Sequence, residues 1–491
     1  MRALVSVYDK TGLVGFVSRL VTAGYEIVSS GGTADALEDA GVPVTRVSEV
    51  TDAPEILGGR VKTLHPRIHG GILARGAVDD EELAANGIQR FDLVVCNLYP
   101  FRATLASGAE DDRLVEMIDI GGPAMIRAAA KNHRHVGVVV SPSQYHEVAA
   151  AIEAGGLGDD LRRRLAAEAF FQSASYDSAI VEWLGEDLVL PLRRVGKLRY
   201  GENPHQGSVL YRDDGAMPWW AQAVFHQGKE MSFNNYVDAE AAWSLCADLG
   251  PGSVVVVKHT NPCGAAVGPT VVESFEAAWE GDSLAAFGGV VAIAGELDRA
   301  TAEAISARFV EVVVAASIAT SAIEALAGKP GLRVLTAPLP VRGVGYRRVE
   351  GGFLAQDPDS FEGEEWVVAS SRAPTDEEMD SLRFAWRVAA HTKSNAIVIA
   401  RGSQAVGVGA GDQSRVGAAE RAAVKAGDRA KGAVAASDAF FPFRDGVDAL
   451  AAAGVVAVVE PGGSRNDQEV IDAADELGMA LVFTGGRHFR H

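Results

Sequence analysis

Short apolar runs alternate with amphipathic stretches through the first part of the chain. The runs LVSVYD, YEIVSS, FDLVVC and HVGVVVS have the length of buried strands, and the stretches TGLVGFVSRLVTAG and GGTADALEDAG have the apolar spacing of helices. This alternation predicts an α/β fold, in which helices cover a parallel sheet. Residues Leu161 to Trp183 predict one or two further helices. The polar stretch PLRRVGKLRYGENPHQG that follows predicts a junction between domains.

The second half of the chain shows the same alternation. Two similar patterns, SVVVVKHTNPCGAA and NAIVIARGSQAVGVGAG, each place a polar turn after a buried strand and suggest an internal duplication. A chain of 491 residues is too long for one core, so we predict two domains, at residues 1–190 and 191–491. The strands expected in the second half are Ser253–Val257, Val290–Ala294, Glu311–Ala315, Ala396–Ala400, Gly454–Val459 and Ala480–Phe483.

Composition narrows the class of protein. No uncharged apolar run is long enough to cross a membrane, and Asp9 comes too early for a secretory signal, so we expect a cytoplasmic protein. Cys96, Cys246 and Cys263 are too far apart for a disulfide framework or a zinc-ligand pair. The formal net charge of −20 argues against nucleic acid as a partner.

Polar residues in the N-terminal half lie where an α/β sheet binds ligands. Residues 30–33, SGGT, stand between a strand and a helix, where backbone N–H groups can hold an anion, although a Gly-Gly turn alone is more often only a tight turn. The segment GGRVKTLHPRIHGG is too polar for a buried helical face, so we expect a solvated or binding loop. Tyr99, Asp119 and Lys131 singly suit structural roles. Together with Lys62 they suit proton transfer on a phosphorylated substrate.

The strings SVYDKTGL, SGGTA, GGRVKTLHP, CNLYPF, IDIGG and RAAAKNH resemble the IMP cyclohydrolase domain, whose fold resembles methylglyoxal synthase. The resemblance implies that the carboxamide nitrogen of formyl-AICAR (AICAR is 5-aminoimidazole-4-carboxamide ribonucleotide) attacks its formyl carbon, and that water leaves to give IMP. Ring closure would be carried by Lys62, Tyr99, Asp119 and Lys131. The residues implied to line the nucleotide site are Lys10, Ser30, Gly31, Gly32, Thr33, Arg60, Thr63, Cys96, Asn97 and Ile120.

In the C-terminal half, Lys258 and His259 follow the apolar run SVVVV and should emerge at a strand end. Such a lysine could favour a neutral histidine base, although two exposed residues at a strand end are the simpler interpretation. A zinc deaminase is disfavoured, because no second cysteine follows Pro262 and Cys263 at the required spacing.

The strings KLRYGENPHQ, KHTNPCGAA, AFGG, SNAIV, GAGDQSR, SDAFFPFRD and GGRHFRH resemble AICAR transformylase. The resemblance implies two cytidine-deaminase-like α/β subdomains without zinc, and formyl transfer from the co-substrate 10-formyltetrahydrofolate to AICAR, with no metal needed for the chemistry. The catalytic residues would be Lys258, His259 and Asn395. AICAR would also contact Arg199, Tyr200, His205, Gly288, Glu311, Phe440 and Arg487, and folate would contact Arg415, Asp445, Ser464 and Arg465.

The joint order of these motifs, from Ser6 to Arg487, favours a bifunctional enzyme of purine-nucleotide synthesis. One rival is a methylglyoxal-synthase-like lyase fused to an unrelated domain. Another is a non-catalytic nucleotide sensor that has kept the fold. The resemblance also implies a homodimer with transformylase sites shared between subunits, and small-molecule partners alone: AICAR, formyl-AICAR, IMP and folate.

Overall fold

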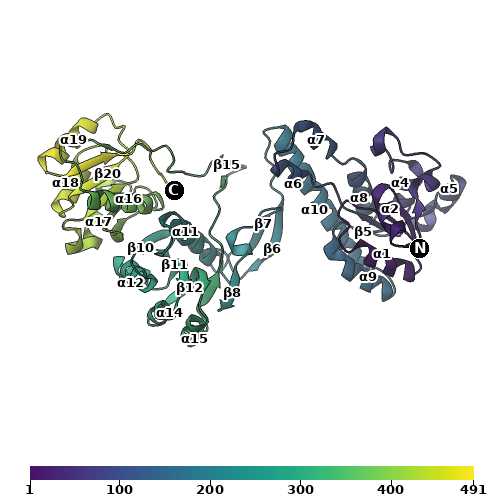
Figure 1. Cartoon of the computed structure of the whole chain (residues 1–491), viewed down its shortest axis with the longest axis horizontal. Coiled ribbons are helices and arrows are strands. Elements are labelled where there is room, and N and C mark those ends of the chain that lie inside the picture. The colour runs from purple at the N-terminus through teal and green to yellow at the C-terminus, as the bar shows by residue number, and fades with distance from the viewer. The chain divides into compact units, whose positions relative to one another are not determined.

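The structure is a computed structural model that describes residues 1–491, and the chain divides into two compact units. The first unit comprises residues 1–193 and 211–214, and the second comprises residues 194–210 and 215–491. In Figure 1 the first unit is purple to blue and the second runs from teal to yellow. The chain passes between them through a two-stranded sheet of β6 (Leu192–Leu198), which lies in the predicted junction, and β7 (Ser208–Asp213), which directly follows it.

The first unit is built on a five-stranded sheet in the order β3-β2-β1-β4-β5, and every pairing is parallel, as predicted. Val5 pairs with Ser29 on one side, and Ser6 pairs with Cys96 on the other. The loops that follow these strands therefore begin level with one another at one edge of the sheet. The strands are β1 (Arg2–Ser6), β2 (Glu26–Ser29), β3 (Thr45–Arg46), β4 (Leu93–Cys96) and β5 (Gly137–Val139).

The helices of the first unit bury apolar faces against this sheet, and the stretch from Leu161 to Trp183 forms one long helix, α10. The expectation of a loop across GGRVKTLHPRIHGG is wrong for its second half. Pro66 starts helix α4 there, and His65 caps it by accepting a hydrogen bond from the Arg67 N–H, while Ile68 is buried. The α-helices are α1 (Leu13–Thr22), α2 (Gly31–Asp39), α3 (Val47–Thr51), α4 (Pro66–Leu73), α5 (Asp80–Ala85), α6 (Phe101–Ala106), α7 (Asp111–Glu116), α8 (Gly121–Lys131), α9 (Tyr145–Glu153) and α10 (Asp159–Leu184).

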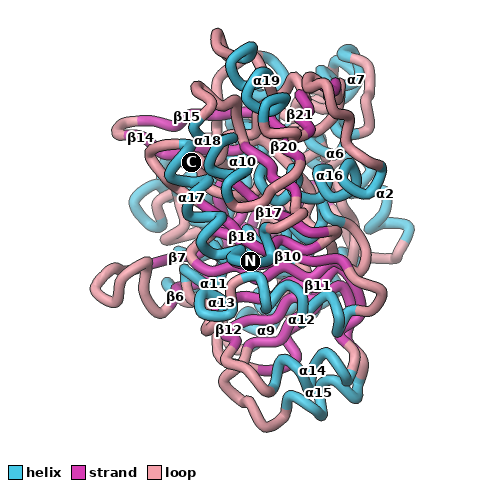
Figure 2. Tube along the Cα trace, turned by 90° about the vertical axis from the view of Figure 1, so that its left-hand side faces the viewer, coloured by secondary structure: helices cyan, strands magenta, loops and turns pink.

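The second unit contains a twelve-stranded sheet in the order β16-β21-β20-β19-β17-β18-β10-β9-β11-β12-β13-β8. Figure 2 shows strands from β21 to β12 following one another along it. All six strands predicted for this half are present. The strands are β8 (Val224–Gln227), β9 (Ser253–Lys258), β10 (Asn261–Val267), β11 (Gly289–Leu297), β12 (Val310–Ile318), β13 (Arg333–Thr336), β16 (Val367–Val368), β17 (Ile397–Arg401), β18 (Gln404–Gly409), β19 (Val434–Ser437), β20 (Ala457–Glu460) and β21 (Ala480–Phe483).

This sheet consists of two repeats of one topology, which confirms the internal duplication. In each repeat an antiparallel hairpin (β9 and β10, or β17 and β18) precedes three parallel strands, and a short antiparallel strand closes the edge. The two repeats join where β10 pairs with β18. The helices follow the same plan: α11 (Phe233–Leu249), α12 (Val271–Gly281), α13 (Ser283–Ala286), α14 (Arg299–Ser306) and α15 (Thr320–Leu326), then α16 (Asp376–Ala390), α17 (Arg415–Ala426), α18 (Asp445–Ala452) and α19 (Asp467–Glu476).

Equivalent residues carry the packing in both repeats. Trp243 on α11 and Trp386 on α16 are the largest fully buried side chains of the chain. Gly264 on β10 and Gly407 on β18 let a helix approach closely, because a Cβ would lie 1.7 Å from the Ala278 carbonyl oxygen or 2.2 Å from that of Ala422. The duplication therefore extends to the side chains that set the distance between sheet and helices.

A connector, defined here as residues 338–366, joins the two repeats and includes the hairpin of β14 (Gly345–Val349) and β15 (Gly352–Gln356). It accepts hydrogen bonds from both buried tryptophans, at the Pro338 carbonyl from Trp243 and at the Glu364 carboxylate from Trp386. No helix of the chain combines the length and apolarity needed to cross a bilayer. No cluster of three or more His, Cys, Asp or Glu side chains is arranged to hold a metal ion.

Candidate active sites in the two units

A cavity of about 520 Å³ opens in the first unit, where the loops after β1, β2 and β4 meet. These loops leave the carboxyl ends of the strands, and this is the edge at which open parallel sheets bind ligands. Of the fourteen residues predicted for this site, the cavity is lined by twelve: Lys10, Ser30, Gly32, Thr33, Arg60, Lys62, Thr63, Cys96, Asn97, Tyr99, Asp119 and Ile120.

Lys62 reaches the anion-binding turn through a channel between two glycines. A Cβ on Gly31 would lie 2.8 Å from its Nζ, and a Cβ on Gly59 would lie 2.7 Å from its Cε. Both glycines have positive φ, of 52° and 89°. The Gly31 N–H, at the start of α2, donates to Glu55 Oε1 at 3.2 Å, and Glu55 Oε2 lies 3.5 Å from Lys62 Nζ. A carboxylate of the chain therefore occupies the predicted phosphate position.

Asp119 is the carboxylate expected to take part in ring closure, and it lines the cavity. Burial raises its pKa, while the Gly122 N–H, which donates to Oδ1 at 2.8 Å, and the charge of Lys62 oppose the shift. Its own N–H donates to the Tyr176 hydroxyl at 2.8 Å, which fixes the loop before α8. Tyr99 stands at the mouth, 37% exposed. The cavity thus combines an ammonium, a desolvated carboxylate and an accessible phenol.

Three of the lining residues have structural tasks. The Thr33 hydroxyl is buried and exchanges hydrogen bonds with the N–H and carbonyl of Val7. The Asn97 amide accepts from the N–H groups of Tyr8 and Asp9 and donates to the Asp9 carbonyl. Burial raises the pKa of the Cys96 thiol well above its usual value, which keeps the thiol neutral. The Thr33 and Asn97 side chains hold the loop after β1 in shape, while the Cys96 Sγ donates to the Gly122 carbonyl at 3.9 Å.

Lys131 does not line the cavity. It is exposed at the last residue of α8, whereas Gly121 and Gly122 at the first turn of this helix border the cavity. Eleven residues of helix separate the two ends by about 15 Å at 1.5 Å per residue. Within this chain, the lysine therefore lies away from the other predicted catalytic groups.

In the first repeat of the second unit, predicted residues meet at the amino ends of β11, β12 and β13. Lys258 ends β9, which runs antiparallel to β11, and its Nζ donates to the Phe287 carbonyl at 2.5 Å. A Cβ on Gly288 would lie 3.9 Å from that Nζ. Glu311 accepts from the Asn235 amide at 3.0 Å. Arg199, Tyr200 and Glu311 line a cavity of about 470 Å³, together with Lys229, Lys329 and Arg333.

His259 is exposed in a two-residue turn whose backbone is strained. Both His259 and Thr260 have positive φ, of 53° and 65°, although neither is glycine. Asp238 on α11 accepts from both of their N–H groups, at 3.3 Å and 2.7 Å. Burial raises the pKa of Asp238, and these two N–H donors oppose the shift. The carboxylate therefore fixes the direction in which His259 leaves the sheet.

In the second repeat, the predicted residues gather at the opposite end of the parallel strands. Phe440 and Asp445 follow β19, Ser464 and Arg465 follow β20, and Arg487 follows β21. Because these three strands are parallel neighbours, their carboxyl ends share one edge. Asn395 precedes β17, which is antiparallel to β19, and so starts at the same edge.

Arg415 is buried beneath this edge rather than exposed on it. Its guanidinium donates to Asn395 Oδ1 at 2.7 Å, to the Ser437 hydroxyl at 2.8 Å and to Asp438. The Asn395 amide donates in turn to the Asp412 carbonyl at 2.9 Å. Arg415 thus orients Asn395, a role that the motif GAGDQSR alone does not reveal. His205 is exposed in the loop after β6.

Sequence analysis missed Glu55, Glu116, Asp238 and Lys229. Glu116 pairs with Arg60 at the cavity of the first unit. Each of these four residues looks like an ordinary surface charge, and only the folded chain brings it to a site. The spacing SFNNYVDAE could have pointed to Asp238, because it places this acid on the helix that immediately precedes the Lys258 strand.

The fold and these two groups of residues define a two-unit α/β enzyme that acts on small molecules. The family described as AICARFT/IMPCHase bienzyme matches residues 129–425, and the MGS-like domain matches residues 12–124. A "Bifunctional purine biosynthesis protein PurH" from Myxococcus xanthus is 49% identical over 100% of both chains, and one from Deinococcus deserti is 50% identical over 100% of this chain and 99% of its own. The chain belongs to the AICARFT/IMPCHase family, the bifunctional AICAR formyltransferases and IMP cyclohydrolases of purine biosynthesis.

A solved structure titled "Crystal structure of ForH" is 37% identical and covers 37% of this chain and 95% of its own. Its TM-score of 0.34 is too low to bear on the fold. The fold assignment therefore rests on the MGS-like match for the first unit and on the strand order itself for the second. The likeness of each repeat to cytidine deaminase stays a prediction.

Proposed function

We propose that the two reactions are divided between the halves of the chain, with IMP cyclohydrolase in residues 1–190 and AICAR transformylase in residues 191–491. The observation that supports this division is the cavity of the first unit, which gathers twelve of the fourteen residues predicted for the cyclohydrolase site and none predicted for formyl transfer. The transformylase residues all lie in the second unit.

For ring closure, the phosphate of formyl-AICAR binds the Gly31 N–H, where the Glu55 carboxylate now lies. The carboxamide nitrogen then attacks the neighbouring formyl carbon within one molecule, so the cavity chiefly selects the reactive conformer. Tyr99 and Lys62 stabilise the oxyanion, and Asp119 accepts a proton from the attacking nitrogen and passes it to the oxygen. The oxygen leaves as water once it has also taken the proton of the former formamide nitrogen. Lys131 lies away from the cavity in this chain. It would therefore contribute to ring closure only in an arrangement that a single chain does not form.

For formyl transfer, His259 takes the proton of the AICAR amine while the amine attacks the formyl carbon of 10-formyltetrahydrofolate. Lys258 stabilises the resulting oxyanion and supplies a proton to the departing folate nitrogen. Asn395, held by Arg415, orients the reacting groups. Folate lies against Asp445, Ser464 and Arg465, and no step requires a metal.

The transformylase is a homodimer in this proposal, and each of its sites combines the first repeat of one subunit with the second repeat of the other. The two groups of site residues lie at opposite ends of the parallel strands in their own repeats. Beside Lys258, Leu284 is 90% exposed, and the rings of Phe287 and Phe309 are 59% and 50% exposed with centroids 4.9 Å apart. An apolar surface of this kind next to catalytic groups suits a partner subunit. We place the enzyme in the cytoplasm.

The division is tested by following tetrahydrofolate release and IMP formation separately. His259→Ala should abolish formyl transfer and leave cyclisation of added formyl-AICAR nearly intact, and Lys62→Ala should do the reverse. Lys131→Ala measures whether the distant lysine contributes to ring closure. Loss of both activities in a correctly folded single variant would contradict the division.

A further inference from the structure

The C-terminal tail, defined as residues 484–491, has no regular secondary structure after β21, yet its backbone is fixed. The His488 N–H donates to the Asp438 carbonyl at 3.0 Å, and the Arg490 carbonyl accepts from the Ser394 N–H at 2.9 Å. A chain end frays unless contacts of this kind hold it. The backbone of the tail is therefore held at His488 and Arg490, on both sides of Phe489. His488 directly follows Arg487.

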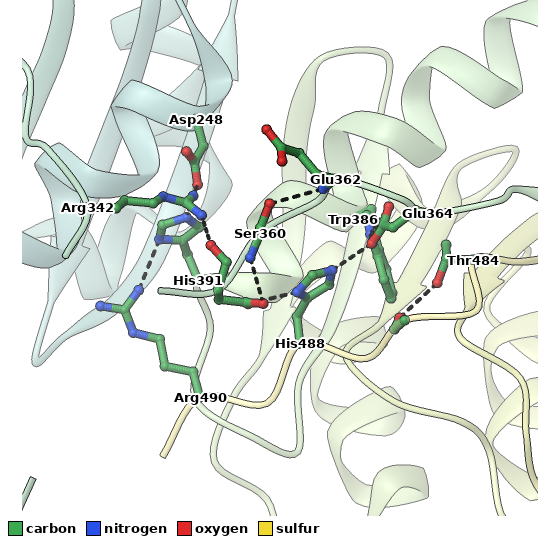
Figure 3. Close-up of polar contacts among 12 residues, drawn as sticks. Asp248, Arg342, Ser360, Glu362, Glu364, Trp386, His391, Thr484, His488 and Arg490 are labelled. Carbon is green, nitrogen blue, oxygen red and sulfur yellow. Dashed lines mark hydrogen bonds and ion pairs between the residues drawn. The ribbon is translucent and has the colours of Figure 1, made fainter. Parts of the chain in front are cut away.

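The His488 side chain is 3% exposed and lies between two carboxylates of the connector (Figure 3). Its Nδ1 is 2.7 Å from Asp359 Oδ2 and its Nε2 is 2.7 Å from Glu364 Oε1, while the ring packs against Phe361 and Trp386. Because both ring nitrogens face carboxylates, both donate and the ring is a cation. Burial opposes the charge, but the two hydrogen bonds raise the pKa of His488 to about 9.

Arg490 makes the second tether, and the histidine it meets has the opposite protonation state. Its Nη1 donates to His391 Nδ1 at 3.0 Å, and His391 Nε2 donates to Asp248 Oδ2 at 2.5 Å, as Figure 3 shows. Burial lowers the pKa of His391, which is consistent with a neutral ring. Arg342 also pairs with Asp248. The tail network thus balances three cations, Arg342, His488 and Arg490, against three carboxylates, Asp248, Asp359 and Glu364.

These tethers determine how Arg487 is presented. His488 points inward, whereas Arg487 and Phe489 on either side of it are exposed. The Arg487 guanidinium lies 4.7 Å from the Phe489 ring and makes no ion pair with any carboxylate of the chain. An unpaired guanidinium held in place is suited to bind a phosphate or carboxylate.

We propose that His488 and Arg490 are positioning residues for formyl transfer, which hold the tail so that Arg487 meets the phosphate of AICAR. The inference rests on the proposed transformylase activity and on the predicted contact of Arg487 with AICAR. A guanidinium on a loose terminus would lose conformational freedom each time substrate bound, and this loss would weaken AICAR binding. Once AICAR is bound, the reacting groups are unchanged. The tethers should therefore govern KM for AICAR rather than kcat.

The test compares His488→Leu with Glu362→Gln, a matched control that removes an exposed charge from the same connector without touching the tail network. Steady-state formyl transfer gives KM and kcat, and cyclisation of added formyl-AICAR in the same chain reports on folding. Carboxypeptidase digestion followed by intact-mass measurement reports how fast the tail is trimmed past Arg487. Arg490→Met repeats the test at the other tether should His488→Leu fail to fold.

We expect His488→Leu to raise KM for AICAR about tenfold or more and to change kcat less than about twofold, with cyclisation unchanged. The tail should be trimmed faster than in Glu362→Gln. An unchanged KM despite faster trimming, or an unchanged trimming rate, would overturn the proposal. Arg487→Ala separates the two claims. If it raises KM while both tether variants do not, the tethers are not positioning residues, and if it leaves KM unchanged, the assigned role of Arg487 fails and the proposal fails with it.

Discussion

Glu55 is a residue whose charge competes with the substrate of the first unit. Its carboxylate accepts from the Gly31 N–H, which is proposed to bind phosphate, and lies beside Lys62, which is proposed to stabilise the oxyanion. Glu55→Gln removes the charge and keeps a similar shape. Because the ion pair is partly exposed, we expect a modest gain, a roughly threefold lower KM for formyl-AICAR in the cyclisation assay. Glu81→Gln, on the exposed face of α5, should leave KM unchanged. A higher KM in Glu55→Gln would show instead that Glu55 organises the site.

Asp238 stabilises the turn formed by His259, the proposed base, and Thr260, which both have positive φ. Left-handed backbone at non-glycine residues costs about 1–3 kcal/mol each, and here one of the two is the β-branched Thr260. Asp238→Ala should therefore let the turn relax and lower kcat for formyl transfer about tenfold or more, with little change in cyclisation. Thr260→Gly, which adopts this backbone without strain, should restore most of the loss in the double variant. If the double variant is no better than Asp238→Ala, the carboxylate acts by some route other than the turn.

At the scale of elements, apolar patterning was sufficient for most of the fold. The six strands expected in the second half are all present, because buried parallel strands such as Val312 to Ala315 are apolar on both faces. The beginning of α4 was missed because its polar first turn hides an apolar face that only Ile68 and Ile72 reveal. The connector and the tail could not be predicted at all. Their positions depend on ion pairs between segments more than a hundred residues apart, such as Glu364 with His488.

Glu460 shows how burial at the end of a strand keeps a carboxyl group protonated. It ends β20, is fully buried, accepts from the Phe441 N–H through Oε2, and leaves Oε1 without a partner. Burial, opposed by that N–H, raises its pKa from 4.5 to about 8. The folded state therefore holds a proton that the unfolded state releases, and stability falls as pH rises from about 4.5 to about 8.

Replacing this carboxyl with an amide should remove that pH dependence. Glu460→Gln should melt within about 1 °C of the parent near pH 5, where both side chains are neutral, and about 2 °C or more above it at pH 8. Thermal unfolding followed by circular dichroism across this range measures the difference. Glu420→Gln, an exposed change on α17, is the control and should show no such trend. An equal offset at both pH values would mean that the charge of Glu460 is not responsible.

At the scale of the whole molecule, the two sites differ in how far sequence could specify them. The cavity of the first unit is assembled from loops that leave adjacent strands at one edge, so the motifs name residues that the structure brings together. The second unit divides its predicted residues between two repeats, at the amino ends of β11 and β12 in one and at the carboxyl ends of β19 and β20 in the other. Motifs cannot reveal which of these sheet edges meet in one site, because that depends on how two subunits assemble.

A transformylase site built from two subunits makes a prediction that a site built within one chain does not. His259→Ala damages the first repeat and Asn395→Ala damages the second, and each homodimer should be inactive in formyl transfer. In a mixed dimer with composite sites, one site carries both changes and the other carries neither. Random mixing, which makes half of the dimers mixed, should then recover about a quarter of the parent activity. If each site were built within one chain, every site would carry one change and nothing would be recovered. Native mass spectrometry verifies that mixed dimers form, and cyclisation in the same samples verifies folding, so the absence of recovery in verified mixed dimers would place each transformylase site within a single chain.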